Sequence, residues 1–147
     1  MISTPRTVGL AIGAVCVIAG GLVAAVTGPL DLAKGSWLAA YLVLVAGVAQ
    51  VVLADQHRLL QVEASSRAEW TTVALWVGGN SAVIGGTLLR QPLLVDAGGI
   101  ALALALLYAV LGTRRTRAAT LGWALRLVYV VVLVSIPIGL VLAHQRA

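Results

Sequence analysis

Two polar side chains stand inside long apolar stretches of this sequence, where a group that contacts a ligand or an ion is expected to lie. Asn80 is ten residues into the apolar stretch 70–89, and Asp96 is three residues past Leu93, where the next stretch begins. Hydrocarbon offers such groups no hydrogen-bonding partner, and ionisable residues within membrane spans are often functional. Both residues are therefore candidates for contact with a solute or a cation.

Each of these residues also has a structural interpretation. An amide at the depth of Asn80 can form a hydrogen bond between helices, worth on the order of 1 kcal/mol, and we favour this over a ligand contact. Asp96 lies in the first turns of its predicted helix, where the helix dipole stabilises an anion. Arg90 and Lys34 are expected on the same side of the membrane and could pair with it. The sequence supports both interpretations of Asp96.

Three more side chains complete the candidate site. Trp76 precedes Asn80 by four residues and therefore lies on the same helix face. Gln50, near the end of the stretch 37–54, and Arg126, near the start of 123–143, are expected at similar depths, and we predict a hydrogen bond between them. Arg126 can also extend its charged group to the membrane interface. The candidate polar intramembrane site thus consists of Gln50, Trp76, Asn80, Asp96 and Arg126.

We find no combination of residues that would support catalysis or bind a metal. His57 and His144 are predicted on opposite sides of the membrane, so a haem held between them is not expected. Cys16 is the only cysteine, so an intramolecular disulfide is impossible. The glycines lie inside apolar stretches, without the strand context of a phosphate-binding loop. We therefore expect no metal and no cofactor, and we favour a non-enzymatic role.

The elements that carry these residues are five apolar stretches, at 8–26, 37–54, 70–89, 93–111 and 123–143. Each has about the ~20 residues that a helix needs to cross a bilayer. The chain is 61% hydrophobic and only 10% charged, whereas soluble domains carry roughly 25% charged residues. We predict an all-α bundle of five transmembrane helices that forms one transmembrane domain over residues 1–147.

The segments between these stretches predict how the helices are connected. Gly28 and Pro29 should end the first helix, because proline cannot continue it. The segment 55–69 is the longest connection and contains no glycine or proline, so we expect the second helix to continue into it. Pro92 follows so closely on the third stretch that a tight antiparallel hairpin is expected, with this proline in the first turn of the fourth helix. Pro137 should kink the fifth helix.

Small residues are expected to pack the helices, because lipid supplies no hydrophobic drive for helix association. The first stretch contains Gly9 and Gly13, and the fourth contains the pair Gly98 and Gly99. In the third stretch, Gly78, Ala82 and Gly86 are spaced four residues apart, with Gly79 and Gly85 beside them. This small face is predicted to lie opposite Asn80, which is about 200° from Gly78 around the helix.

Basic residues beside the spans predict the orientation, because they accumulate on the cytoplasmic side. One side carries Arg6, Arg58, Arg67, Arg114, Arg115 and Arg117, and the other carries Lys34, Arg90 and Arg146. The N-terminus is therefore predicted in the cytoplasm and the C-terminus outside. The first stretch is longer than the core of a signal peptide, so we expect it to remain uncleaved. The preference for arginine over lysine is typical of GC-rich bacterial genomes, so the inner membrane is the expected location.

Three functions are compatible with these features. The favoured one is a non-enzymatic membrane protein, either an accessory subunit of a membrane complex or a self-associating bundle. The second is a small oligomeric transporter or channel that uses Asn80, Asp96 and Gln50. The third is a membrane enzyme acting on lipid or quinone. The net charge of +5 does not indicate a nucleic-acid partner, because the basic residues are spread over the connecting segments and form no basic face.

Overall fold

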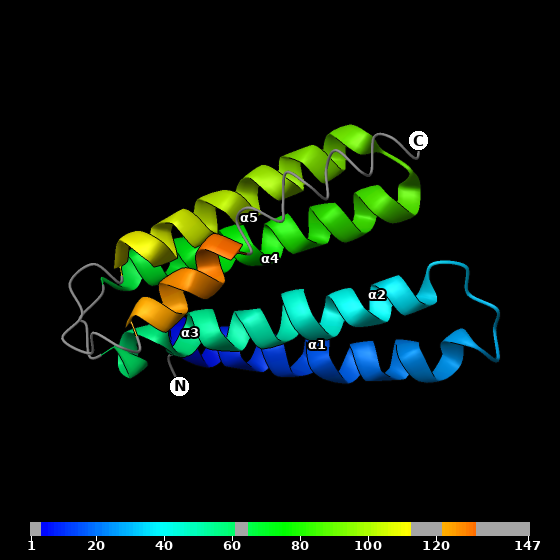
Figure 1. Cartoon of the computed structure of the whole chain (residues 1–147), viewed down its shortest axis with the longest axis horizontal. Helices are drawn as coiled ribbons and strands as arrows, with labels where there is room; N and C mark the ends of the chain where they lie inside the picture. The colour runs from blue at the N-terminus through cyan, green and yellow to red at the C-terminus, as the bar shows by residue number, and fades with distance from the viewer. Residues whose placement is uncertain (1–3, 61–64, 113–121, 132–147) are drawn as a thin grey trace. The chain divides into compact units, whose positions relative to one another are not determined.

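The computed structural model describes residues 4–60, 65–112 and 122–131, which are helical and contain no strand (Figure 1). The chain divides into two compact units, Met1–Gln56 and His57–Ala147. The helices are α1 (Pro5–Thr27), α2 (Gly35–Tyr41), η1 (Leu42–Ala49), α3 (Gln50–Leu59), α4 (Ser66–Leu89) and α5 (Pro92–Gly112), followed by a short helix over Gly122–Val131.

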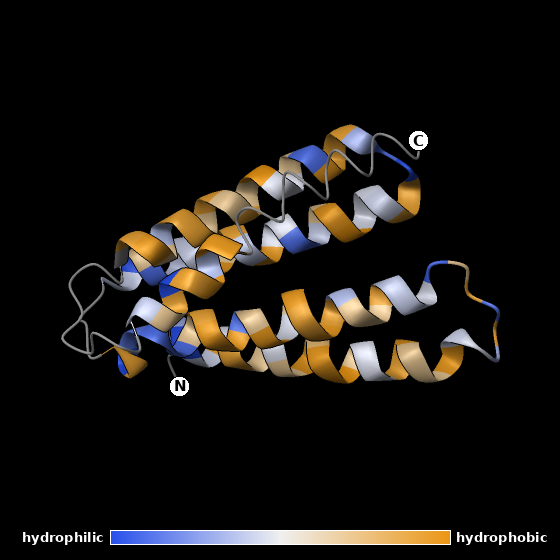
Figure 2. Ribbon diagram, in the orientation of Figure 1, coloured by the Kyte–Doolittle hydropathy of each residue, from blue (hydrophilic) through white to orange (hydrophobic). Residues whose placement is uncertain are grey.

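Among the described residues, four helices are long and apolar enough to cross a membrane, and they coincide with the first four predicted spans within a few residues. They are Pro5–Thr27, Gly35–Leu59, Ser66–Leu89 and Pro92–Leu111. Hydrophobic residues cover most of their length, as Figure 2 shows. In the predicted fifth span, the described residues form the short apolar helix Gly122–Val131. The rest of that span lies outside the described residues, together with Pro137, so the count of five and the kink stay predictions.

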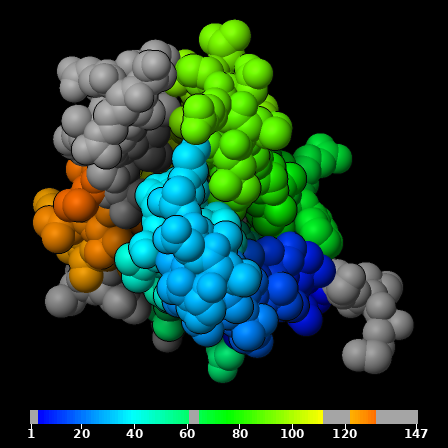
Figure 3. All heavy atoms as spheres, turned by 90° about the vertical axis from the view of Figure 1, so that its right-hand side faces the viewer, coloured from blue at the N-terminus to red at the C-terminus, as the bar shows by residue number. Residues whose placement is uncertain are grey.

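The first unit is a hairpin in which α1 packs against the continuous helix formed by α2, η1 and α3. Thr4 caps the start of α1, because its Oγ1 accepts a hydrogen bond from the backbone N–H of Thr7 at 3.2 Å. The helix ends at Thr27, before Gly28 and Pro29, as predicted. A hydrogen bond of 3.0 Å from the N–H of Leu32 to the carbonyl of Thr27 closes the turn. Figure 3 looks onto the end of the unit that carries this turn.

Glycine lets the two helices of the first unit approach closely. A Cβ atom on Gly13 would lie 3.0 Å from the carbonyl oxygen of Gly47, and one on Gly47 would lie 3.2 Å from that of Gly13. Backbone atoms cannot move aside as side-chain atoms do, so a larger residue at either position would separate the helices. Gly9 is also buried. The predicted packing role of Gly9 and Gly13 is confirmed.

The sequence did not predict η1, a π-helix in the middle of the second span. Around it, Ala39, Val43, Gly47 and Val51 all contact α1, at intervals of four residues. In an α-helix, positions four residues apart rotate by about 40° at each step, so Val51 would lie about 120° from Ala39. The wider π turn removes this drift and keeps all four positions against α1. The same helix continues past residue 54 to Leu59, as predicted.

The second unit contains the hairpin of α4 and α5, which confirms the predicted tight turn. Arg90 ends α4 in the left-handed conformation (φ 55°, ψ 42°), and its backbone N–H donates to the carbonyl of Gly86. The N–H of Gln91 donates to the same carbonyl at 2.8 Å. Pro92 then begins α5. The hairpin fixes the register in which the two helices face each other.

The packing face of α4 is only partly the predicted one. Gly79, rather than Gly78, faces α5: a Cβ on Gly98 would lie 2.7 Å from the carbonyl oxygen of Gly79, whereas a Cβ on Gly78 would meet nothing within 4 Å. Gly86 does pack against α5, where its Cβ would lie 2.8 Å from the backbone nitrogen of Val95. The positions that contact α5, Gly79, Val83 and Gly86, are spaced as in a heptad seam. The buried residues Thr72 and Trp76 continue the same spacing toward the start of α4.

Candidate polar intramembrane site

Asn80 is a buried polar residue near the middle of α4. Its side chain is only 4% exposed. The Nδ2 group donates a hydrogen bond of 2.8 Å to the carbonyl of Trp76, one turn earlier in the same helix. Only the nitrogen of the amide can donate to a carbonyl, so this bond determines which way the amide is turned. Its Oδ1 atom has no hydrogen-bond partner in the described part of the chain.

Trp76 is buried on the same side of α4 as Asn80. It is 1% exposed, the most buried of the four tryptophans, whereas Trp37, Trp70 and Trp123 are substantially exposed. Its indole Nε1 also lacks a partner among the described residues. An unsatisfied buried donor or acceptor costs about 1–3 kcal/mol. Two such atoms one turn apart are a costly arrangement unless something binds them.

The predicted interhelical bond of Asn80 is therefore not what the structure shows. The amide bonds within its own helix. The predicted opposition of a small face and a polar face is confirmed only in part: Gly78 is exposed whereas Trp76 and Asn80 are buried, but Gly79 and Gly86 are buried as well. The placement of Trp76 and Asn80 on one face is confirmed by their common burial.

Gln50 lies in the first unit, at the junction of η1 and α3. It is 1% exposed, and its Oε1 has no partner within the described residues. The hydroxyl oxygen of Tyr41, at the other end of η1, is likewise buried and unpartnered there. The predicted hydrogen bond from Gln50 to Arg126 would join the two units, and it stays a prediction.

Asp96 is half-buried in the first turns of α5, as expected. The hairpin register places it about level with Val83, because Gly98 packs against both Gly79 and Val83. Asp96 and Asn80 are therefore separated in depth by only about one helical turn. Asp96 and Arg126 are both engaged in interactions of their own. Pairing of Asp96 with Arg90 or Lys34 stays a prediction.

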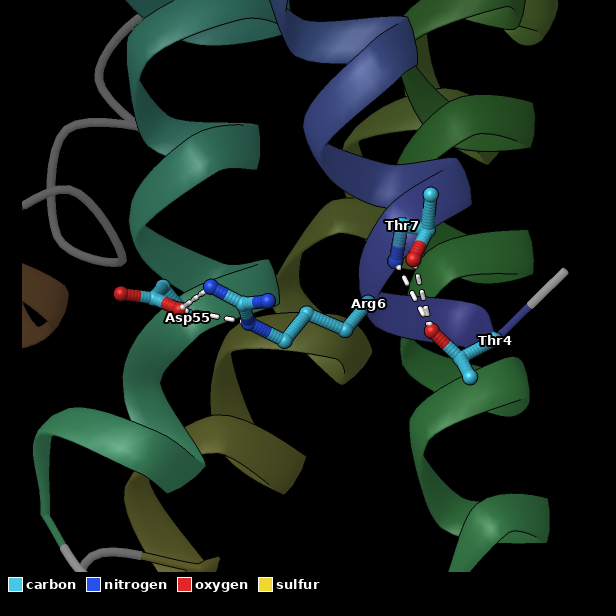
Figure 4. A network of polar contacts seen from close by, with 4 residues as sticks. All are labelled: Thr4, Arg6, Thr7 and Asp55. Atoms are coloured by element: carbon cyan, nitrogen blue, oxygen red, sulfur yellow. Dashed lines mark hydrogen bonds and ion pairs between the residues drawn. The ribbon is translucent and has the colours of Figure 1, made fainter.

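An ion pair that was not predicted joins the two helices of the first hairpin near the start of α1. Arg6 on α1 reaches Asp55 on α3: its Nε donates to Oδ1 at 2.7 Å, and its Nη2 lies 2.6 Å from the same oxygen (Figure 4). Both side chains are partly exposed, so the pair contributes at most about 1 kcal/mol. The predicted topology contained the signal, because it placed both residues at the cytoplasmic ends of adjacent antiparallel spans.

The described residues contain no group of three or more histidine, cysteine, aspartate or glutamate side chains that could hold a metal ion. Comparison of the chain with protein families, with curated proteins and with solved structures finds no match.

Proposed function

We propose that this chain is a non-enzymatic polytopic membrane protein that self-associates through one face of α4. The observation that carries the proposal is a second small-residue face on this helix, made of Ala74, Gly78, Ser81 and Gly85. It repeats at intervals of four, three and four residues, like the seam that packs on α5. We call it the outer α4 face.

Within the described part of the chain, the outer α4 face makes few contacts. Ala74, Gly78 and Ser81 are exposed, and a Cβ on Gly78 would meet no atom within 4 Å. A Cβ on Gly85 would meet only Leu94 Cδ2, at the ordinary distance of 3.9 Å. Large apolar side chains, by contrast, are what gives a lipid-facing helix its contact with acyl chains. Small residues instead allow two helix backbones to approach, which is how helices associate in lipid.

The buried polar groups give less support to a transport function. A solute path would require Asn80 to line a hydrated route, but its amide is buried and bonded to its own helix. In this proposal the protein is a helical bundle in a bacterial inner membrane, with five spans and its N-terminus in the cytoplasm. Its assembled form is a homo-oligomer.

Cysteine cross-linking in membranes tests the proposed interface. In a Cys16→Ala background, Ser81→Cys should form a disulfide-linked dimer under mild oxidation. Ile100→Cys is the matched control, since it is exposed and about level with the same part of α4. It should remain monomeric. Equal dimer yields from both positions would show that collision, rather than a specific interface, brings the copies together.

A packing variant tests the same face without cysteines. Gly78→Leu should abolish the dimer, whereas Gly21→Leu on α1, another glycine with nothing within 4 Å of its Cβ position, should leave it intact. Native mass spectrometry from nanodiscs measures both. A wild-type chain that is monomeric under all these conditions would contradict self-association. A Ser81→Cys adduct with a different protein would replace it with the accessory-subunit alternative.

A further inference from the structure

The buried side of α4 carries two polar atoms that have no hydrogen-bond partner among the described residues. The indole N–H of Trp76 is a donor only, and Oδ1 of Asn80 is an acceptor only. Both side chains are more than nine-tenths buried, and neither atom has a partner in the described part of the chain. Their residues are four apart in one helix, so the side chains are neighbours about 5–6 Å apart at Cβ.

The orientation of the amide is set by the chain itself. Nδ2 of Asn80 is held on the carbonyl of Trp76 at 2.8 Å, so Oδ1 points away from that carbonyl. Turning the amide over would place two acceptor oxygens in contact. The helix therefore carries an oriented acceptor, Oδ1 of Asn80, one turn from the indole donor of Trp76, and both groups are neutral. In the sequence, the span from residue 70 to residue 89 contains no charged side chain.

We propose that Trp76 and Asn80 together bind the hydroxyl group of one neutral molecule. A hydroxyl is the smallest group that accepts from the indole N–H and donates to the amide oxygen at the same time. A carboxylate cannot donate to Oδ1, and an ammonium cannot accept from Nε1. The hydroxyl can belong to a water molecule or to an alcohol with an apolar body, which would enter from the lipid.

The proposal is independent of self-association, because these residues lie on the buried side of α4 and not on the outer α4 face. It assigns Trp76 a role different from that of the other tryptophans. Those lie nearer the helix ends, where an indole N–H can reach polar groups at the membrane interface.

Nuclear magnetic resonance of the indole group tests the site. The full chain is labelled with 15N-tryptophan in nanodiscs of deuterated lipid, and Trp76 is assigned by its loss in Trp76→Phe. We expect a cross-peak between the Trp76 indole proton and a hydroxyl-bearing molecule. A cross-peak to water that 1-octanol does not alter identifies a bound water. A saturable shift with 1-octanol, accompanied by cross-peaks to its methylene protons, identifies an alcohol site. Octane, which lacks the hydroxyl, should cause no shift.

Variants show whether Asn80 shares the bound group. Asn80→Leu should remove the cross-peak and shift the indole proton upfield, whereas Leu88→Ala, an exposed position nearer the end of the same helix, should change neither. A wild-type indole proton with no hydroxyl contact, with or without octanol, would overturn the proposal. So would a cross-peak that survives in Asn80→Leu. The wild-type measurement decides the matter even if Asn80→Leu does not fold.

Discussion

At the scale of single residues, adjacent glycines in α4 have opposite surroundings. A Cβ on Gly79 would lie 2.9 Å from Leu102 Cγ and 3.0 Å from the carbonyl oxygen of Gly98. A Cβ on Gly78 would enter open space. Helix crossings in lipid depend on van der Waals packing of backbones, so one methyl group should have very different effects at these two positions.

We expect Gly79→Ala to lower the free energy of unfolding by about 1–3 kcal/mol, because overpacking forces the helices apart. Gly78→Ala should change it by less than about 0.5 kcal/mol, as is usual for exposed sites. Unfolding of both variants in the same detergent, followed by circular dichroism, measures the difference. Equal losses would mean that α5 packs against a different face of α4.

At the scale of elements, the turn between α4 and α5 requires a backbone conformation that is unfavourable for arginine. Arg90 has φ 55° and ψ 42°, a left-handed conformation in which a Cβ atom costs roughly 1–2 kcal/mol. Glycine is the usual residue at this position after a helix. The hairpin thus forms in spite of Arg90 and is held by the two hydrogen bonds to Gly86.

Replacing Arg90 by glycine should therefore stabilise the hairpin by up to about 1 kcal/mol. Arg90→Val should destabilise it, since a β-branched residue fits this region poorly. Both variants remove the same charge, so the difference between their thermal unfolding midpoints isolates the backbone effect. Identical midpoints would argue against a left-handed residue at position 90.

The π-helix η1 shows how an element can be reshaped by its neighbour. Gly20 and Gly13 of α1 contact residues of the second helix that are spaced four apart. Only a locally wider helix satisfies that spacing over three turns. The hydrophobicity of residues 42–49 is compatible with either helix type, so no local signal separates them.

At the scale of the whole molecule, the distribution of basic residues predicts the direction in which each span crosses. Single cysteines in a Cys16→Ala background report it: Ser66→Cys should be labelled only from the cytoplasm, and Gln91→Cys only from outside. Both residues are exposed. An impermeant maleimide applied to intact cells and to inverted vesicles measures the accessibility. The reverse pattern would contradict the cytoplasmic N-terminus.

The same labelling distinguishes five spans from four. Ala147→Cys should react from outside if the stretch 123–143 crosses the membrane, since an odd number of spans places the termini on opposite sides. Reaction from the cytoplasm alone would limit the protein to the four spans Pro5–Thr27, Gly35–Leu59, Ser66–Leu89 and Pro92–Leu111.

Much of this architecture was predictable because its causes are local. The length of an apolar stretch sets where a span begins and ends. Pro29 lies in the first turn, and Pro92 begins the helix that follows the second. The candidate site was predictable only in part. Common spacing put Trp76 and Asn80 on one face, but it could not show that the amide would bond to its own helix.

The sequence by itself determined the four long apolar helices, the first hairpin turn at Gly28 and the second at Arg90, because these depend on hydropathy and backbone chemistry along a short segment. Only the tertiary structure decided that Gly79 packs while Gly78 does not, that η1 is wider than an α-helix, and that Arg6 meets Asp55. Those outcomes depend on which atoms of a distant segment come within van der Waals or hydrogen-bonding range, and a repeating pattern of small residues fits several such arrangements equally well.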